Sequence, residues 1–110
     1  MEIDNLCKEV HEWAKSKGWW DEGDRNMGEI LALIHSEVSE ALEEYRVGKM
    51  ATYRLGKDGI KPCGFYSELA DVVIRIADLF GKEGISLADE IETKMAYNEN
   101  RPYRHGNKKC

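Results

Sequence analysis

The sequence predicts a small all-α protein, a bundle of about four helices that oligomerisation would complete. Apolar residues recur at helical spacing in four stretches, which glycine and proline residues separate. Strand-type alternation of polar and apolar residues is absent. The chain has 110 residues, which is enough for one core but not for two. We therefore expect a single domain over residues 1–110, whose modest core would gain from oligomerisation.

Residues 3–17 predict the first helix, because apolar side chains recur there at helical spacing and a glycine follows as a stop. Trp13 takes a core position in this pattern. Residues 19–24 show no period, so we expect a loop that holds two large aromatic side chains, Trp19 and Trp20.

The second predicted helix begins at Asn26, which has the spacing of a capping box with Glu29, and it runs to about Arg46. Residues 47–64 contain four glycines and one proline and show no helical period. A connection of this length is long for a compact domain, and such connections tend to be functional or mobile.

The third helix is expected over about residues 65–80, followed by a turn that Gly81 and Gly84 bracket. Its apolar residues cover most of its circumference, so we expect it to be largely buried. A polar stripe along it includes Asp78.

Ser86 is a good N-cap for a fourth helix, which runs to about Asn100 and which Pro102 closes. The remaining residues, 103–110, form a polar, basic tail.

The charge of the chain is unevenly distributed. The net charge is −5, but residues 94–110 carry five basic residues against one acid. The negative net charge argues against a binder of nucleic-acid polymers, whereas the basic end of an otherwise acidic chain needs an explanation of its own. No apolar stretch is long enough to span a membrane, and the polar N-terminus lacks the pattern of a signal peptide. Three cysteines without a C-x-x-C pair favour a cytoplasmic protein with neither disulfides nor structural zinc.

Two helices each carry a pair of acids at helical spacing. On the second helix, Glu37 falls inside the apolar stripe near Ile30, and Glu40 lies at the edge of that stripe. A carboxylate within a core stripe is costly unless it is paired, protonated or bound to a metal. On the third helix, Glu68 and Asp71 project from one face. If the two helices face each other, all four carboxylates converge.

Converging carboxylates repel one another, and a hard divalent cation removes this repulsion. Oxygen ligands without histidine or cysteine favour Mg²⁺, with Mn²⁺ as a possible substitute, over zinc. A di-iron bundle would need Glu-x-x-His motifs, which the chain lacks. The alternative is that each pair of acids belongs to an ordinary solvated helix face.

The acids match a known pattern. EVSE at 37–40 and ELAD at 68–71 are separated by 27 residues. This arrangement resembles the E-x-x-E…E-x-x-D pattern of the MazG-like all-α nucleoside triphosphate pyrophosphohydrolases. The segments 28–46, 65–79 and 94–109 extend the resemblance over nearly the whole chain.

The resemblance implies hydrolysis of a nucleoside triphosphate (NTP or dNTP) between the α and β phosphates, giving a nucleoside monophosphate and pyrophosphate. It implies Mg²⁺ held by Glu37, Glu40, Glu68 and Asp71, and a metal-activated water that attacks the α-phosphorus. Glu37 or Glu40 would orient this water. It also implies a homodimer or a tetramer of dimers, in which helices of two subunits form the active bundle.

The resemblance also implies that the basic end of the chain binds the phosphates of the substrate. Lys94 and Asn98 would face the triphosphate, and Arg101 and Arg104 would add to them. The chain departs from the pattern at Cys63, where close relatives carry an acid.

The two loop tryptophans and the reaction itself leave alternatives open. Trp19 or Trp20 would stack on a nucleobase, or else cap the core of the bundle. A non-catalytic helical assembly or regulatory module would keep the same fold without turnover. A relative of phosphoribosyl-ATP pyrophosphatase is a second enzyme that would fit.

Overall fold

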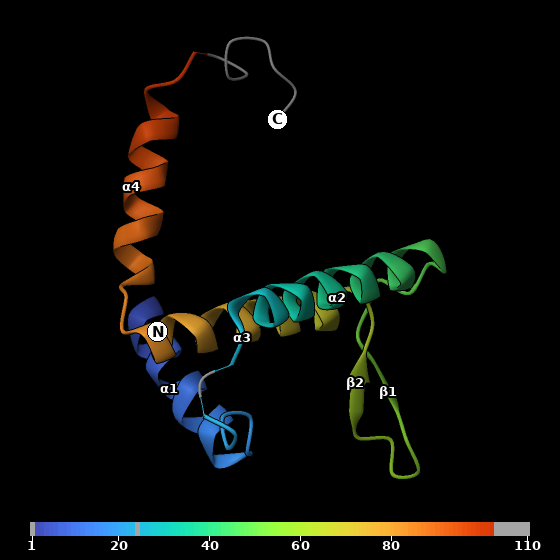
Figure 1. The fold of residues 1–110 in the computed structure, drawn as a ribbon. Coiled ribbons are helices and arrows are strands. Elements are labelled where there is room, and N and C mark those ends of the chain that lie inside the picture. The colour runs from blue at the N-terminus through green and yellow to red at the C-terminus, as the bar shows by residue number, and fades with distance from the viewer. Residues whose placement is uncertain (1, 24, 103–110) are drawn as a thin grey trace.

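The computed structural model describes residues 2–23 and 25–102. Over these residues the chain forms four helices and one two-stranded sheet, in the order α1, α2, β1, β2, α3, α4 (Figure 1). The expected all-α fold with about four helices is therefore confirmed. The basic tail predicted over 103–110, with Arg104, lies outside the described residues.

Helix α3 is the centre of the fold. α1 (Ile3–Ser16) and α2 (Met27–Arg46) both pack against α3 (Phe65–Glu83), whereas α4 (Leu87–Glu99) packs against α1. Beyond this contact, α4 extends away from the other helices (Figure 1). No helix among the described residues is both long enough and apolar enough to cross a membrane.

Side-chain caps begin two of the helices where the sequence predicts. The Asn26 side chain accepts a hydrogen bond from the Glu29 backbone N–H at 3.2 Å, and Ser86 Oγ accepts one from the Asp89 N–H at 3.0 Å. These bonds satisfy backbone donors that have no partner within the helix.

Asp4 joins the start of α4 to α1. Its carboxylate accepts hydrogen bonds from the Ala88 backbone N–H at 3.0 Å and from Ser86 Oγ at 2.6 Å. The bond from the Ala88 backbone, followed by that from Ser86, lowers the pKa of Asp4 below its usual value. These bonds fix the base of α4, while its remaining turns stay exposed.

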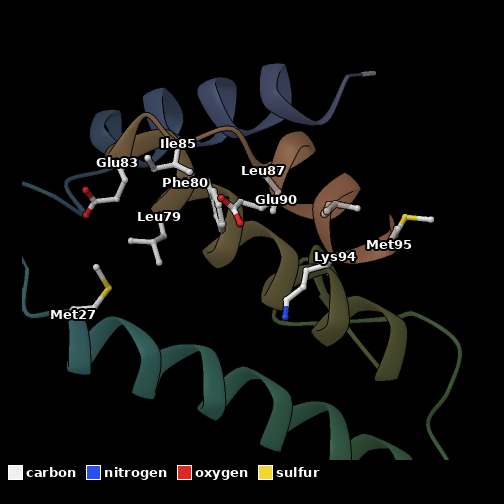
Figure 2. A pocket seen from close by; sticks show the side chains of 10 residues that line it. Met27, Leu79, Phe80, Glu83, Ile85, Leu87, Glu90, Lys94 and Met95 are labelled. Carbon is white, nitrogen blue, oxygen red and sulfur yellow. The ribbon is translucent and has the colours of Figure 1, made fainter. Parts of the chain in front are cut away.

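An apolar groove of about 620 Å³ separates α4 from the end of α3 (Figure 2). Lys94 and Glu90 line it from α4. The apolar side chains that line it are Met27, Leu79, Phe80, Ile85, Leu87, Ile91 and Met95.

The long connection between α2 and α3 contains a β-hairpin that the sequence did not predict. Strands β1 (Tyr53–Leu55) and β2 (Lys61–Cys63) pair antiparallel, with Tyr53 opposite Cys63. The Tyr53 hydroxyl donates a hydrogen bond to Glu44 on α2 at 2.9 Å, which fixes the base of the hairpin. Strands of three residues are too short for a period of two to be detected.

Two expectations about burial were wrong. α3 is not largely buried, because α1 and α2 leave one of its faces open, and Leu69 and Val73 on α3 are exposed. Trp13 is 45% exposed and packs edge-on against Trp19 at the rim of the fold.

Helix α3 also continues past Gly81, where the sequence predicts a turn. It ends at Gly84 in a left-handed cap with φ 68°.

Candidate functional site

Three glutamates from two helices meet where α2 packs against α3. One carboxylate oxygen from each of Glu37, Glu40 and Glu68 lies within 4.8 Å of the other two. Glu37 and Glu40 project from one face of α2, and Glu68 lies in the first turn of α3. We call these three residues the acid cluster. The sequence predicted that two pairs of acids converge, and the packing of α2 on α3 brings three of these four acids together.

Asp71 lies beside the acid cluster, one turn further along α3. It shares a hydrogen bond with Glu68, which lowers its pKa, as does the charge of Arg75. Desolvation and the charge of Glu37 outweigh both effects, so the pKa of Asp71 is raised above its usual value. The fourth predicted ligand therefore interacts electrostatically with Glu37 and Glu68, although it lies outside the group of three.

Glu68 holds its proton more strongly than an ordinary glutamate does. Desolvation raises its pKa to about 7, and a hydrogen bond with Glu40 and the charges of Glu40, Asp71 and Glu37 act in the same direction. Glu68 thus keeps its proton up to near neutral pH, next to Glu40. Protonation of one partner is one way to make two adjacent carboxyl groups tolerable, and a cation is another.

Glu37 is the buried member of the cluster, with 8% of its surface exposed. Its Oε1 accepts a hydrogen bond from Arg75 Nε at 2.8 Å. Its Oε2 is buried and has no hydrogen-bond partner, alone among the described side chains that are not exposed. Such an oxygen carries a desolvation cost until a donor or a cation reaches it.

The acid cluster fits a hard divalent cation. Its donor set consists of carboxylate oxygens, which Mg²⁺ and Mn²⁺ prefer. Glu37 Oε2 is a buried oxygen without a hydrogen-bond partner among the described residues, so it is available as a ligand atom. Glu40 is exposed, so solvent and a ligand can reach the cluster from its side.

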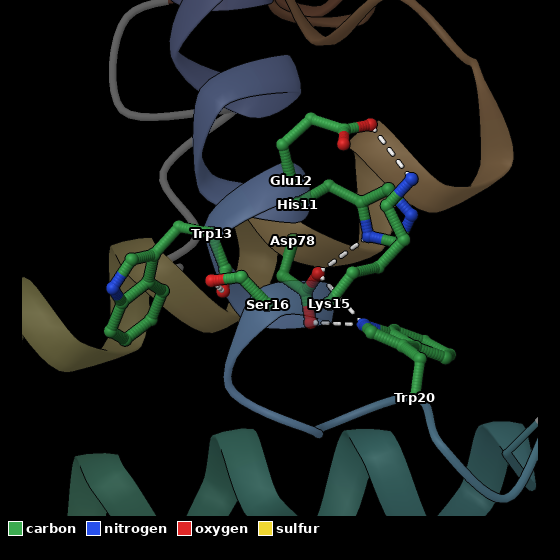
Figure 3. Close-up of polar contacts among 7 residues, drawn as sticks. All are labelled: His11, Glu12, Trp13, Lys15, Ser16, Trp20 and Asp78. Atoms are coloured by element: carbon green, nitrogen blue, oxygen red, sulfur yellow. Dashed lines mark hydrogen bonds and ion pairs between the residues drawn. The ribbon is translucent and has the colours of Figure 1, made fainter.

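Trp20 is half-buried, and its indole N–H already has hydrogen-bond partners. Its indole N–H donates to both carboxylate oxygens of Asp78, at 3.0 and 3.1 Å, and His11 Nδ1 lies 2.8 Å from the same carboxylate (Figure 3). Asp78 is buried. This hydrogen-bonded group, which ties the loop after α1 to α3, was missed because helical spacing cannot show which side chains meet across two elements.

Trp19 faces a pocket of about 700 Å³ that Arg25, Asn26 and Arg75 also line. The Arg75 guanidinium lies over the Trp19 ring, 5.2 Å from its centroid. Arg75 also donates a hydrogen bond to Glu37, so it links this pocket to the acid cluster.

The predicted phosphate-binding residues that the structure describes are not brought to the acid cluster within one chain. Lys94, Asn98 and Arg101 lie on or just after α4, which extends away from α2 and α3 (Figure 1). Lys94 lines the apolar groove, Asn98 is exposed, and the Arg101 guanidinium lies 5.6 Å from the centroid of the Tyr97 ring.

No protein-family model, curated protein or solved structure matches this chain.

The raised pKa of Glu68 predicts how pH changes the stability of the metal-free protein. The folded pKa is about 7 against a usual value of 4.5, so between these values the folded state binds a proton that the unfolded state has lost. Stability therefore falls as pH rises through this range. Asp71, whose pKa is also raised, acts in the same direction.

Thermal melts in EDTA, between about pH 5 and pH 8, should show the melting temperature falling as pH rises. Glu68→Gln should flatten this slope, because the variant cannot titrate there. A melting temperature that rises with pH in the wild type, and responds equally in the variant, would contradict the assignment.

Proposed function

We propose that this protein is a Mg²⁺-dependent nucleotide pyrophosphohydrolase of the MazG-like type. It would hydrolyse an NTP or dNTP between the α and β phosphates, giving a nucleoside monophosphate and pyrophosphate, as a cytoplasmic enzyme of the nucleotide pool. The observation that carries the proposal is the acid cluster, in which the buried Glu37 keeps one oxygen without a partner. The motif spacing that predicted this cluster supports the same conclusion.

In this proposal Glu37, Glu40, Glu68 and Asp71 hold the metal. When bound, Mg²⁺ offsets phosphate charge and lowers the pKa of a coordinated water. Glu40 is the better candidate to orient the attacking water and accept its proton, because it is exposed. Glu37 is buried and already accepts a hydrogen bond from Arg75, so its role is to bind rather than to exchange protons.

The phosphate-binding residues would come from a second subunit. Lys94 and Asn98 belong to α4, which extends away from α2 and α3 (Figure 1). Apolar side chains on the two helices that carry the cluster are exposed in the single chain and would be covered in a homodimer or a tetramer of dimers. They are Val38 and Leu42 on α2 and Leu69 and Val73 on α3. Exposed apolar patches of this kind mark interaction surfaces.

For the nucleobase, Trp19 is a better candidate than Trp20. Trp19 lines an open pocket beside Arg75, whereas the indole N–H of Trp20 is bound to Asp78. Arg75 covers one face of the Trp19 ring, so a base would stack on the other face.

The direct test is pyrophosphate release from a panel of NTPs, dNTPs and phosphoribosyl-ATP, with Mg²⁺ and with EDTA. We expect equal amounts of nucleoside monophosphate and pyrophosphate from at least one NTP or dNTP, and none in EDTA. Turnover of phosphoribosyl-ATP alone would favour the second enzyme. A folded protein that turns over no substrate would leave the non-catalytic assembly module, which the exposed apolar residues also favour.

Mg²⁺ alone should stabilise the protein, because it binds the folded acid cluster and not the unfolded chain. At a concentration about 100 times its dissociation constant, a ligand adds about 2.7 kcal/mol to the free energy of unfolding. Differential scanning fluorimetry at neutral pH should show a higher melting temperature with Mg²⁺ or Mn²⁺ than with K⁺ at matched ionic strength. An unchanged melting temperature at millimolar Mg²⁺ would count against the metal site.

A further inference from the structure

Arg75 connects two features that lie on different elements. Its Nε donates to Glu37 Oε1 at 2.8 Å, and its guanidinium lies 5.2 Å from the centroid of the Trp19 ring. Trp19 is in turn held edge-on against Trp13 at 5.2 Å. Arg75 is thus in contact with a carboxylate and with an aromatic face that is itself packed.

This arrangement fixes the orientation of Glu37. A guanidinium is planar and rigid, so its contact with the Trp19 ring restricts the directions in which its N–H groups point. The Nε–H then selects one carboxylate oxygen of Glu37 and leaves Oε2 without a partner. Without this contact the side chain could rotate about its last bond and lose the defined position of the free oxygen.

We propose that Arg75, held by Trp19, is the positioning residue that presents Glu37 Oε2 to the divalent cation. The inference rests on the proposed metal site and adds a residue outside its four carboxylates. It assigns the loop after α1 a role in metal binding, although that loop supplies no ligand.

A simple charge effect gives the opposite prediction. A cation beside the metal site repels the metal, so removing Arg75 would strengthen metal binding if charge were all that mattered. If Arg75 acts by orientation, its loss weakens binding, as the loss of outer partners of metal ligands does, by about 10- to 100-fold. Lysine separates the two effects, because it keeps the charge but cannot reproduce the planar stacked donor.

The experiment measures Mn²⁺ affinity of the full chain by electron paramagnetic resonance of free Mn²⁺, with Mg²⁺ as competitor. We expect R75K to bind Mn²⁺ at least about 10-fold more weakly than the wild type. W19L should also weaken binding, whereas W19F, which keeps an aromatic face, should restore most of it. R46K is the matched control, because Arg46 is exposed and pairs with Glu43 on α2, and it should bind as the wild type does.

A double variant tests whether Trp19 acts through Arg75. R75K/W19L should bind no more weakly than R75K alone, because the ring has no further function once the guanidinium is gone. Additive losses would overturn this part of the proposal. If R75K does not fold, as shown by circular dichroism, the comparison of W19L with W19F carries the test.

The two proposals fail in different ways. A wild type that binds no Mn²⁺ removes the metal site and the role of Arg75 with it. A wild type that binds Mn²⁺, together with an R75K variant that binds it equally or more tightly, leaves the metal site standing and overturns the positioning role alone.

Discussion

Replacing Glu37 by Gln is expected to lower the rate of pyrophosphate release by on the order of 10³-fold, which corresponds to several kcal/mol of transition-state stabilisation by a bound metal. Glutamine keeps the shape of the side chain but brings an amide N–H₂ group and no negative charge. The acid cluster would then lose its buried anionic ligand, the one whose Oε2 has no partner. The variant should also lose the rise in melting temperature that Mg²⁺ gives to the wild type.

The fold should survive this substitution. A glutamine Oε1 can still accept the hydrogen bond from Arg75 Nε, now 2.8 Å from Glu37 Oε1. The change weakens one ion pair, but it also removes a negative charge that faces Glu68 and Asp71. These effects oppose each other, so we expect only a small change in the melting temperature of the metal-free protein.

Glu43→Gln is the matched control for this variant. Glu43 lies on the same helix, is exposed and pairs with Arg46 at 3.3 Å. It removes the same charge from the chain without touching the acid cluster, so turnover and the Mg²⁺ shift should stay at wild-type values. Wild-type turnover in Glu37→Gln would show that the acid cluster does not perform the reaction.

Local features of the site could be predicted from the sequence. The start of α2 at Asn26 was correct because a capping side chain acts within three residues of the helix that it begins. The burial of Glu37 followed from its place in an apolar stripe, since a helix presents residues at fixed angles to its neighbour.

Contacts between distant segments could not be predicted in the same way. The pairing of Glu37 with Arg75, and of Asp78 with His11 and Trp20, depends on how two helices cross. Helical spacing shows which side chains share a face, but it contains no information on the rotation of one helix against another.

The end of α3 illustrates the same limit. Gly81 was read as a helix stop because glycine is a poor helix former, with a cost of about 1 kcal/mol relative to alanine. The structure instead places Gly81 inside α3, where α1 crosses it. A Cβ built on Gly81 would clash with the Cys7 carbonyl oxygen and would lie 2.6 Å from His11 Cβ. The glycine is therefore explained by the approach of another helix, which no local rule detects.

Gly81→Ala is consequently expected to destabilise the protein, although alanine is the better helix former. Inserting a methyl group into a close contact costs about 1–3 kcal/mol and sometimes more, and here the obstacle is backbone, which cannot move without shifting α1. Even after the gain in helix propensity, we expect a net loss of about 2 kcal/mol, which lowers the melting temperature by on the order of 10 °C. Chemical denaturation and differential scanning calorimetry would measure both quantities.

Gly28→Ala separates the crossing from helix propensity. Gly28 also lies in a helix, but a Cβ there would meet only the flexible side chain of Asn26, at 3.0 Å. We expect its effect on stability to stay within about 1 kcal/mol in either direction, since alanine favours the helix while Asn26 adjusts. If Gly81→Ala were as stable as Gly28→Ala, α1 and α3 would not approach each other as closely as the structure shows. The packing of α3, which places Glu68 and Asp71 opposite α2, would then differ from the structure, because both α1 and α2 contact α3.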